Sequence, residues 1–349
     1  MLNFFKNITL FSLGFLPRIK PVVFIVYVCY IHLIAAQQNL VYNGDFEEYS
    51  SCPESPSSPL QNPKEIEKCV GWKAPTYGTS DYFNSCADND SLIGTIQQSS
   101  VGTQFNCCGT QIPVSGFGYL GAFFTNWDSG HNSDYWWEYV QGKLMTTLEN
   151  GKIYKLSLNI SVAEMSDLVI SEFGVYFSDF PVSSETTAPL NVKPQCVFYN
   201  PFYFKDTANW IHLESYFMAN GSEGFLTIGN FQDTLSTDTL RFQNFPFLEN
   251  PRWTYMYIDD LKLIESEIQI PNVFTPNGDG VNDFVPFPNF GTSTNKIVVV
   301  NRWGNLIYES NGINPFWDGK DNSGKNCTEG TYFYRINNTN ISGFIQLMR

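Results

Sequence analysis

Apolar and polar residues alternate along most of this chain after residue 38, with the two-residue period of a β-strand. In Ile153–Val162 every even-numbered residue is apolar and every odd-numbered residue from 155 onward is polar. Such alternation buries one face of a strand and leaves the other toward solvent or a covering loop. Helical periodicity is nearly absent, so the pattern predicts an all-β protein. The same reasoning predicts further strands at Phe173–Phe177, Trp210–Met218, Phe225–Phe231 and Tyr255–Leu263.

Turn residues separate these strands and suggest how they are organised. Asn220-Gly221 supplies two residues that accept positive φ between two predicted strands. The spacing favours an all-β sandwich over residues 38–266, with long loops before Ile153. From about residue 268 to 349 the strands become shorter and Asn/Gly turns separate them, which predicts a second, small β-sandwich. Its strands are expected at Lys296–Val300, Leu306–Tyr308, Thr331–Ile336 and Ile341–Leu347.

Residues 1–36 have a different composition from the rest of the chain. They contain three basic residues and no acidic residue, and their last 16 residues are an apolar run that ends in Ala35-Ala36. A basic flank, a short apolar core and small residues at the exit are typical of a secretory signal peptide. The run is shorter than the roughly 20 residues of a membrane-spanning helix, and His32 interrupts it. We therefore expect signal removal and no transmembrane segment in the remaining chain.

Charge excludes several classes of function. Only 15% of the residues are charged and 16% are aromatic, which excludes a coiled coil and a highly charged disordered chain. The net charge is −14, and it becomes −17 without residues 1–36, which hold three of the 20 basic residues. This balance argues against nucleic-acid binding, which requires a basic surface, and against docking on anionic lipid.

The cysteines favour an oxidising compartment. Seven remain after signal removal, and no pair has the CxxC spacing that is usual in zinc sites. Six of them precede residue 200 and predict a disulfide framework whose 15 pairings the sequence does not resolve. Adjacent Cys107 and Cys108 are expected to bond to different partners, and Cys327 is expected to be an unpaired, buried thiol.

Four motifs in residues 268–349 resemble a known export domain. They are Ile270–Asp283, which contains Pro-Asn-Gly-Asp-Gly, then Asn301-Arg-Trp-Gly304, Trp317-Asp-Gly319 and Glu329–Tyr334. In this order they look like the gliding motility-associated C-terminal domain, the type B sorting domain of the type IX secretion system. The resemblance implies an Ig-like fold, recognition by that secretion machinery, and delivery to the cell surface or medium of a Gram-negative bacterium. The motif residues that it singles out are Asn277, Asp279, Asp283, Arg302, Trp303, Trp317 and Asp318.

The same motifs allow simpler interpretations from residue chemistry. Asn277, Asp279, Asn282 and Asp283 place four oxygen-bearing side chains within seven residues, which suits a hard cation such as Ca²⁺. Alternatively, Asn and Asp cap turns here while the intervening glycines take positive φ. Trp303 and Trp317 are expected to be core residues rather than ligand platforms.

Residues 38–266 resemble, more loosely, the galactose-binding-like jelly-roll modules of carbohydrate-binding proteins. The resemblance rests on Asn43-Gly-Asp-Phe-Glu47, Pro113–Gly116, Tyr135–Tyr139, Gly229–Phe231 and Tyr257-Ile-Asp-Asp-Leu261. It implies that the first and last strands pair and that an acid from each end holds a structural Ca²⁺. On this chain those acids would be Glu47 and Asp259, with Asp45 and Asp260 as reserves. The alternative is that these acids are merely solvated beside core residues.

Aromatic clusters suggest where a sugar would bind. Flat aromatic faces contact the C–H face of a sugar ring, and nearby polar groups take its hydroxyls. The densest cluster is Tyr135–Tyr139, where period 2 separates Trp136 and Glu138 from the other three residues. Our predicted ligand residues are Trp127, Trp136 and Glu138, and the alternative is that these tryptophans are core. A second polar and aromatic loop contains Trp72, Tyr77, Asp81 and Tyr82.

No motif indicates catalysis. The two histidines that follow the signal segment, His131 and His212, belong to no recognisable triad or metal motif, and no phosphate-binding glycine loop occurs. The sequence therefore predicts an exported, non-catalytic protein that binds glycans or polysaccharide. The alternatives are a protein-binding surface adhesin without a sugar site and a cryptic glycoside hydrolase, which would need a pair of carboxyl groups.

Overall fold

A computed structural model describes residues 37–349 except 55–64, 88–100, 102–105, 107, 127–135, 243–252, 289, 291–295, 311–314 and 338. The described residues form 19 strands and one short 3₁₀ helix, η1 (Glu65–Lys68). The strands up to residue 265 are β1 (Trp72–Lys73), β2 (Asp81–Asn84), β3 (Gly118–Asn126), β4 (Tyr139–Lys143), β5 (Ile153–Val162), β6 (Leu168–Ile170), β7 (Glu172–Ser178), β8 (Cys196–Tyr199), β9 (Ile211–Met218), β10 (Phe225–Gly229), β11 (Thr239–Arg241) and β12 (Trp253–Glu265). The all-β prediction is confirmed.

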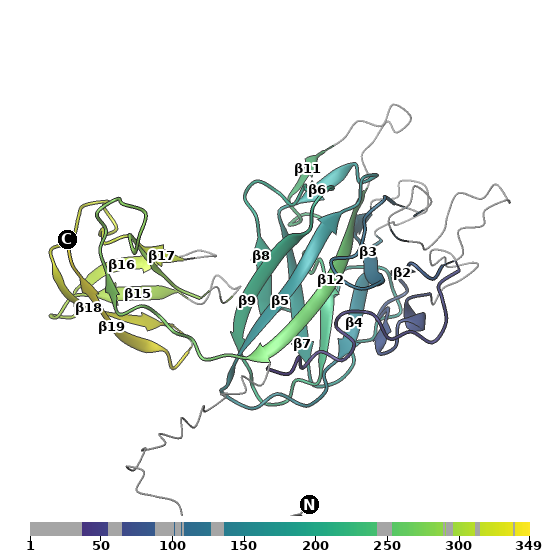
Figure 1. Ribbon diagram of the computed structural model, residues 1–349, viewed down its shortest axis with the longest axis horizontal. Helices are drawn as coiled ribbons and strands as arrows, with labels where there is room; N and C mark the ends of the chain where they lie inside the picture. Colours follow the sequence, from purple (N-terminus) through teal and green to yellow (C-terminus); the bar gives the residue numbers. More distant parts are fainter. Residues whose placement is uncertain are drawn as a thin grey trace, which may run out of the picture. The chain divides into compact units, whose positions relative to one another are not determined.

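Two five-stranded antiparallel sheets form a sandwich. The first has the order β1-β4-β10-β7-β8 and the second the order β2-β3-β12-β5-β9. Figure 1 shows β9, β5 and β12 running side by side in the second sheet. Most neighbouring strands are distant in sequence, as in a jelly roll, and only β2–β3 and β7–β8 are consecutive pairs within these two sheets. Four of the strands, β1 to β4, precede Ile153, and the long stretch between the end of β2 at Asn84 and the start of β3 at Gly118 agrees with the expectation of long loops there.

The core lies between the two sheets and follows the predicted alternation. Tyr154, Leu156, Leu158, Ile160 and Val162 of β5 all belong to one buried cluster, as predicted from the sequence. They face inward-pointing residues of the first sheet, which include Val140, Val175, Leu226 and Ile228. β5 begins and ends at the predicted residues. Its alternation is clear because only one of its faces contributes to the core.

The first described segment pairs with the last strand of the sandwich. The Leu40 N–H donates to the carbonyl of Leu263, and the Leu261 N–H donates to the carbonyl of Gly44, both at 2.8 Å. A Cβ at Gly44 would lie 2.2 Å from the Leu261 carbonyl oxygen, so this approach requires glycine. The two ends of this region are therefore in contact, although the first segment is irregular rather than a strand and the first strand, β1, pairs with β4.

A covering segment, residues 179–195, crosses part of the outer face of the first sheet. Leu190 packs on Trp137 and Tyr139, and its N–H donates to the Tyr139 hydroxyl at 2.9 Å. The Val182 carbonyl accepts a hydrogen bond from the Gln141 side chain. Aromatic residues that would otherwise face solvent are thereby buried on this side of the sandwich.

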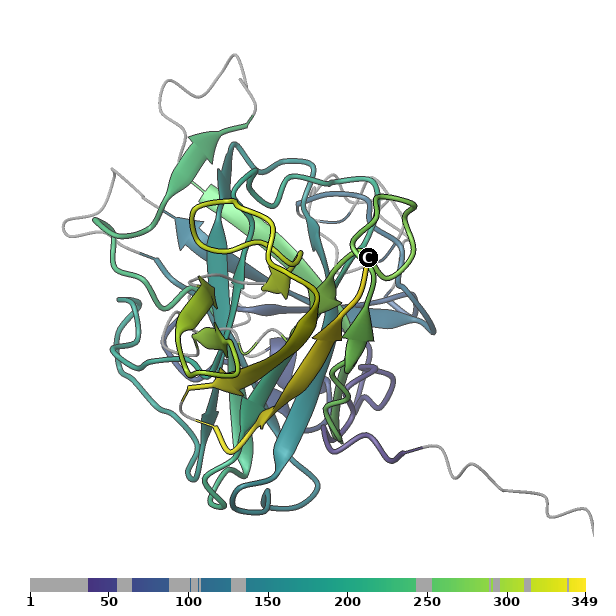
Figure 2. The same ribbon diagram turned by 90° about the vertical axis from the view of Figure 1, so that its left-hand side faces the viewer.

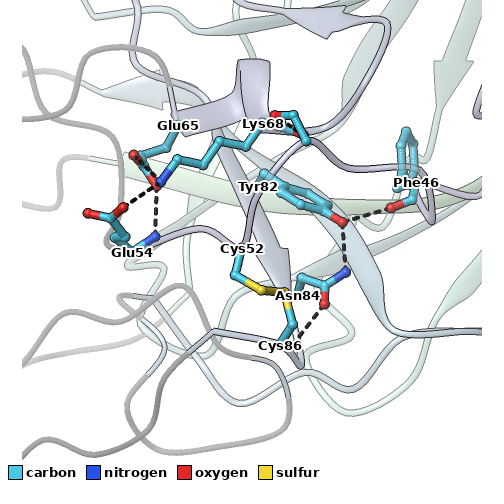
Figure 3. Close-up of a disulfide and its surroundings, with 9 residues drawn as sticks. Phe46, Cys52, Glu54, Glu65, Lys68, Tyr82, Asn84 and Cys86 are labelled. Atoms are coloured by element: carbon cyan, nitrogen blue, oxygen red, sulfur yellow. Dashed lines mark hydrogen bonds and ion pairs between the residues drawn. A yellow bond between two sulfur atoms is a disulfide. The ribbon is translucent and has the colours of Figure 1, made fainter.

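One disulfide, Cys52–Cys86, fastens the segment before η1 to the end of β2 (Figure 3). Beside it, Lys68 makes ion pairs with Glu54 and the buried Glu65. Cys69 and Cys196 are thiols in the core, so the predicted six-cysteine framework is wrong for these two residues. Cys107 lies outside the described residues. Cys327 is a thiol as expected, although it is only half-buried.

The remaining seven strands lie after residue 272. They are β13 (Val273–Phe274), β14 (Val285–Pro286), β15 (Ile297–Val300), β16 (Leu306–Ser310), β17 (Phe316–Trp317), β18 (Gly330–Ile336) and β19 (Ser342–Leu347). One sheet has the order β13-β19-β18-β15-β16, and β14 pairs with β17 in a second, two-stranded sheet. Figure 2 shows β18 and β19 as adjacent yellow strands. Trp317 is fully buried in their core with Phe274 and Tyr332.

Candidate functional site

A groove of about 400 Å³ lies at the β1 end of the first sheet, over β1, β4 and β10. Its lining consists of Glu67, Gly71, Trp72, Lys73, Gln141, Gly142, Lys143 and Phe225. Strand pairing places Lys73 opposite Gln141 and Phe225 opposite Lys143. The groove therefore combines an aromatic ring, an amide and two ammonium groups on one face of three neighbouring strands.

Glycine gives the groove its floor. A Cβ at Gly142 would lie 2.7 Å from the Trp72 indole. Position 142 of β4 must therefore be glycine for the Trp72 ring of β1 to fit against it. Trp72 is held by a hydrogen bond from Nε1 to the Asn43 carbonyl at 2.9 Å and by an edge-on contact with Phe46. The wall of the groove is thus fixed by buried contacts with the turn at residues 42–46.

Gln141 is the most constrained polar residue in the groove. Its side chain is 1% exposed, and its Nε2 donates to the Thr227 hydroxyl at 3.0 Å and to the Val182 carbonyl at 3.3 Å. Its Oε1 is buried and accepts no hydrogen bond from any described residue. Because the Val182 carbonyl can only accept, Nε2 must face it, which fixes Oε1 as the unpartnered atom. A buried acceptor without a donor is costly, so this atom suits a donor from a ligand or a bound water.

The predicted sugar-binding cluster is arranged differently from the expectation. Glu138 is completely buried, and Trp136 is half-buried beside it. Glu138 Oε1 accepts the Trp136 Nε1–H and the Thr79 N–H, each at 2.8 Å, and the Thr79 hydroxyl at 2.9 Å. Its Oε2 accepts the Phe123 N–H at 3.0 Å. The Glu138 carboxylate therefore fixes the Trp136 ring and two backbone segments in place by hydrogen bonds, and it is not presented to a ligand. Trp127 lies outside the described residues.

Burial raises the pKa of Glu138 above its ordinary value, because desolvation disfavours the charged form more than the four hydrogen bonds favour it.

The residues of the second predicted loop also differ in burial. Trp72 lines the groove, Tyr77 is 61% exposed, and Tyr82 donates from inside the core to the Phe46 carbonyl. Asp81 is buried and accepts from the Tyr255 hydroxyl.

The two acids expected to hold Ca²⁺ both contact residues 113–118. Glu47 Oε1 accepts the N–H groups of Phe117 and Gly118 at 2.6 and 3.0 Å. Asp259 Oδ2 accepts the Val114 N–H at 2.6 Å, and burial raises the pKa of Asp259 to about 7. No group of three or more His, Cys, Asp or Glu side chains that could hold a metal occurs among the described residues. An ion bound by these two acids would need backbone carbonyls or water for its other ligands, which Ca²⁺ accepts.

Turn capping accounts for the Asn- and Asp-rich motif after residue 276. Asp283 accepts the N–H groups of Gly278, Gly280 and Asn277 at 2.7 to 3.0 Å. These bonds, that of Gly278 first, lower the pKa of Asp283. Asp279 accepts from the Asn277 amide at 2.9 Å. The loop oxygens are therefore used in Asx-type turns, with both glycines at positive φ.

The two tryptophans of the C-terminal motifs have opposite environments. Trp317 is fully buried and donates from Nε1 to the Lys320 carbonyl at 2.8 Å, while Asp318 pairs with Lys320 at 2.7 Å. Trp303 is 75% exposed in a turn, where the Arg302 guanidinium lies 5.3 Å from its ring centroid. The prediction of a core role is confirmed for Trp317 and wrong for Trp303.

Sequence reasoning missed Gln141, Lys143, Lys73 and Phe225 as site residues. Strand pairing joins β1 to β4 and β4 to β10 across long stretches of chain, and no local motif indicates that pairing. The only available signal was Trp72, which belonged to the second predicted loop.

Comparison with known proteins identifies the C-terminal region. Residues 268–347 match the family model of the CHU_C type IX secretion signal domain, as the resemblance had indicated. This domain marks a secreted or cell-surface protein. The described part of the chain contains no helix that is long and apolar enough to cross a membrane. No curated protein matches the chain in sequence.

Several solved β-sandwiches are similar to the chain at low identity. The CBM22-1 xylan-binding domain of Paenibacillus barcinonensis Xyn10C is 12% identical, covers 67% of this chain and 98% of its own, and has a TM-score of 0.32. The K1 cleaved adhesin domain of Lys-gingipain from Porphyromonas gingivalis is 11% identical, with coverages of 64% and 96% and a TM-score of 0.26. A putative sugar-binding protein from Bacteroides thetaiotaomicron is 11% identical, with coverages of 66% and 100% and a TM-score of 0.26. At these values the likenesses carry no argument about what this chain binds.

Proposed function

We propose that this protein is an exported, non-catalytic glycan-binding protein of the cell surface or medium. The observation that supports it most directly is the groove over β1, β4 and β10. Phe225 offers an aromatic surface for a sugar ring, and Gln141 and the two lysines offer hydrogen-bonding groups for its substituents. The C-terminal domain would deliver this binding module by way of the type IX secretion machinery.

A non-catalytic role is favoured by the chemistry of the groove. Glycoside hydrolysis by the usual route needs two carboxyl groups that flank the scissile bond. Among the described residues Glu67 is the only acid that lines this groove, so no such pair is found in its described lining. A protein-binding adhesin without a sugar site is the second candidate, and the exposed Tyr77 and Trp303 rings are the features that favour it.

The test is binding of the purified, oxidised full chain to a glycan array and to insoluble polysaccharides. Wild type should bind at least one glycan saturably, and Phe225→Ala should abolish that binding. Phe202→Ala removes a 76% exposed ring outside the groove and should have no effect. Loss in Trp136→Ala instead would place the site at the originally predicted cluster. Absence of glycan binding by wild type would contradict the proposal and favour the adhesin.

Export is tested separately from binding. Deletion of residues 268–349 should leave the protein in the periplasm, as judged by fractionation and by protease accessibility in intact cells. Normal surface delivery of the truncated chain would contradict the sorting role. Fusion of residues 268–349 to an unrelated periplasmic protein is the complementary experiment, and it should direct that protein outward.

Structural Ca²⁺ at Glu47 and Asp259 remains part of the proposal. An ion there would join the first described segment, residues 113–118 and β12, which these acids already connect through hydrogen bonds. Calcium should raise the melting temperature of wild type and a chelator should lower it, while Glu47→Gln should abolish the difference. Identical melting with calcium and with chelator would contradict the ion.

A further inference from the structure

We infer that the groove is selective for anionic polysaccharide, in which the sugar carries a carboxylate or a sulfate. This inference rests on the proposed glycan-binding function and names the ligand class for the same groove. Two lysines and the unpartnered acceptor of Gln141 support it, because strand pairing brings them onto one face.

The two lysines lie close enough to act on one anionic group. Lys73 is paired with Gln141, and Lys143 lies two residues further along β4 on the same face. Such diagonal neighbours across an antiparallel pair are about 7–8 Å apart, within reach of long side chains. Both ammonium groups can therefore approach a single carboxylate or sulfate above the β1–β4 pair.

Neither lysine is neutralised within the described protein. Lys73 and Lys143 take part in none of the ion pairs between described residues. Glu67, the one acid in the described lining of the groove, already has an interaction of its own. In a chain with 34 acidic and 20 basic residues, two adjacent lysines without an acidic partner are a local reversal of charge.

Gln141 adds a contact that an inorganic anion would not satisfy. Its buried Oε1 needs a hydrogen-bond donor, which a bare carboxylate or sulfate lacks and a sugar hydroxyl supplies. Phe225 adjoins Lys143 across the strand pair and provides the ring surface. The combination of cation, acceptor and aromatic ring in one groove matches an acidic sugar residue better than a neutral sugar or a free anion.

The experiment measures affinity of the oxidised full chain by isothermal titration at 0.15 M salt. The probes are polygalacturonate and a sulfated galactan as anionic polymers, and xylan and mixed-linkage β-glucan as neutral polymers. Variants are Lys73→Gln, Lys143→Gln and their combination. Lys205→Gln, an exposed lysine outside the groove, is the control for a general change of charge.

Wild type should bind the anionic polymers at least tenfold more tightly than the neutral ones. Each groove variant should weaken anionic binding about tenfold, as expected for loss of one charge-assisted hydrogen bond, while Lys205→Gln should leave it unchanged. Equal binding of neutral and anionic polymers with no effect of either lysine overturns the inference. In that outcome, loss of binding in Phe225→Ala would leave the glycan-binding proposal intact. No binding to any polymer overturns both.

Discussion

Removal of the buried Glu138 carboxylate should destabilise the sandwich strongly, because three segments donate hydrogen bonds to it. Glu138→Ala leaves the N–H groups of Thr79 and Phe123 and the indole N–H of Trp136 without their acceptor. A buried donor left unsatisfied costs about 1–3 kcal/mol, so three cost roughly 3–9 kcal/mol before relaxation. Removing a desolvated charge offsets part of this cost, and we expect a net loss of about 3–5 kcal/mol.

Two further variants separate the charge from the hydrogen bonds. Glu138→Gln keeps one acceptor oxygen but turns an NH₂ group toward one of the donors, so it should cost about 1–3 kcal/mol. Trp136→Phe removes one donor and keeps the carboxylate satisfied by the others, so it should cost about 1 kcal/mol. The assay is urea unfolding followed by circular dichroism at pH 7, with the m-value checked for constancy. An Ala variant within 1 kcal/mol of wild type would refute the reasoning, as would a Gln variant as stable as wild type.

Three further predictions concern stability elsewhere in the chain. Trp317→Ala should lose about 3–5 kcal/mol in thermal unfolding of the C-terminal region and Trp303→Ala less than about 0.5 kcal/mol, and equal effects would contradict their different burial. The Cys52–Cys86 bridge spans 34 residues, so Cys52→Ser with Cys86→Ser should lose about 3–4 kcal/mol against wild type in urea, and no loss would show that the bridge constrains little. Because the pKa of Asp283 is lowered from 3.8, its contribution to stability is present above that pH and is lost as the pH falls through the folded-state value. Asp283→Asn should flatten that part of the stability profile, and an unchanged profile would contradict the assignment.

Strands could be predicted from the sequence where only one face carries apolar residues. β5 alternates cleanly, because its outward residues include Lys155 and Asn159 while its inward residues fill the core. β3 is buried on both faces, with Leu120 inward and Tyr119 under a second aromatic cluster, so its sequence does not alternate. Strands of that kind read as continuous apolar runs and were missed.

The burial of Glu138 was also not predicted, because it depends on segments that are distant in the chain. Period 2 placed Trp136 and Glu138 on the face opposite Trp137 and Tyr139, and sequence reasoning took one face to be exposed. Residues 179–195 cover Trp137 and Tyr139 from outside, and the loop containing Thr79 encloses the Glu138 carboxylate. A residue's face can be predicted from local alternation, whereas its exposure depends on segments that come from elsewhere in the chain.

The groove carries two lysines whereas the chain as a whole is negatively charged. This difference leads to a prediction about how salt changes the affinity for a polyanion. A net charge of −14 repels a polyanion at long range, whereas Lys73 and Lys143 attract it only at contact. The Debye length is about 30 Å at 0.01 M salt and about 8 Å at 0.15 M, so moderate salt screens the repulsion and spares more of the contact attraction. Affinity for polygalacturonate should therefore be higher at 0.15 M than at 0.01 M, and titrations at the two concentrations measure it. Steady strengthening toward low salt, as basic proteins show with polyanions, would mean that the field of the whole surface attracts the ligand and that the two lysines are not its main source.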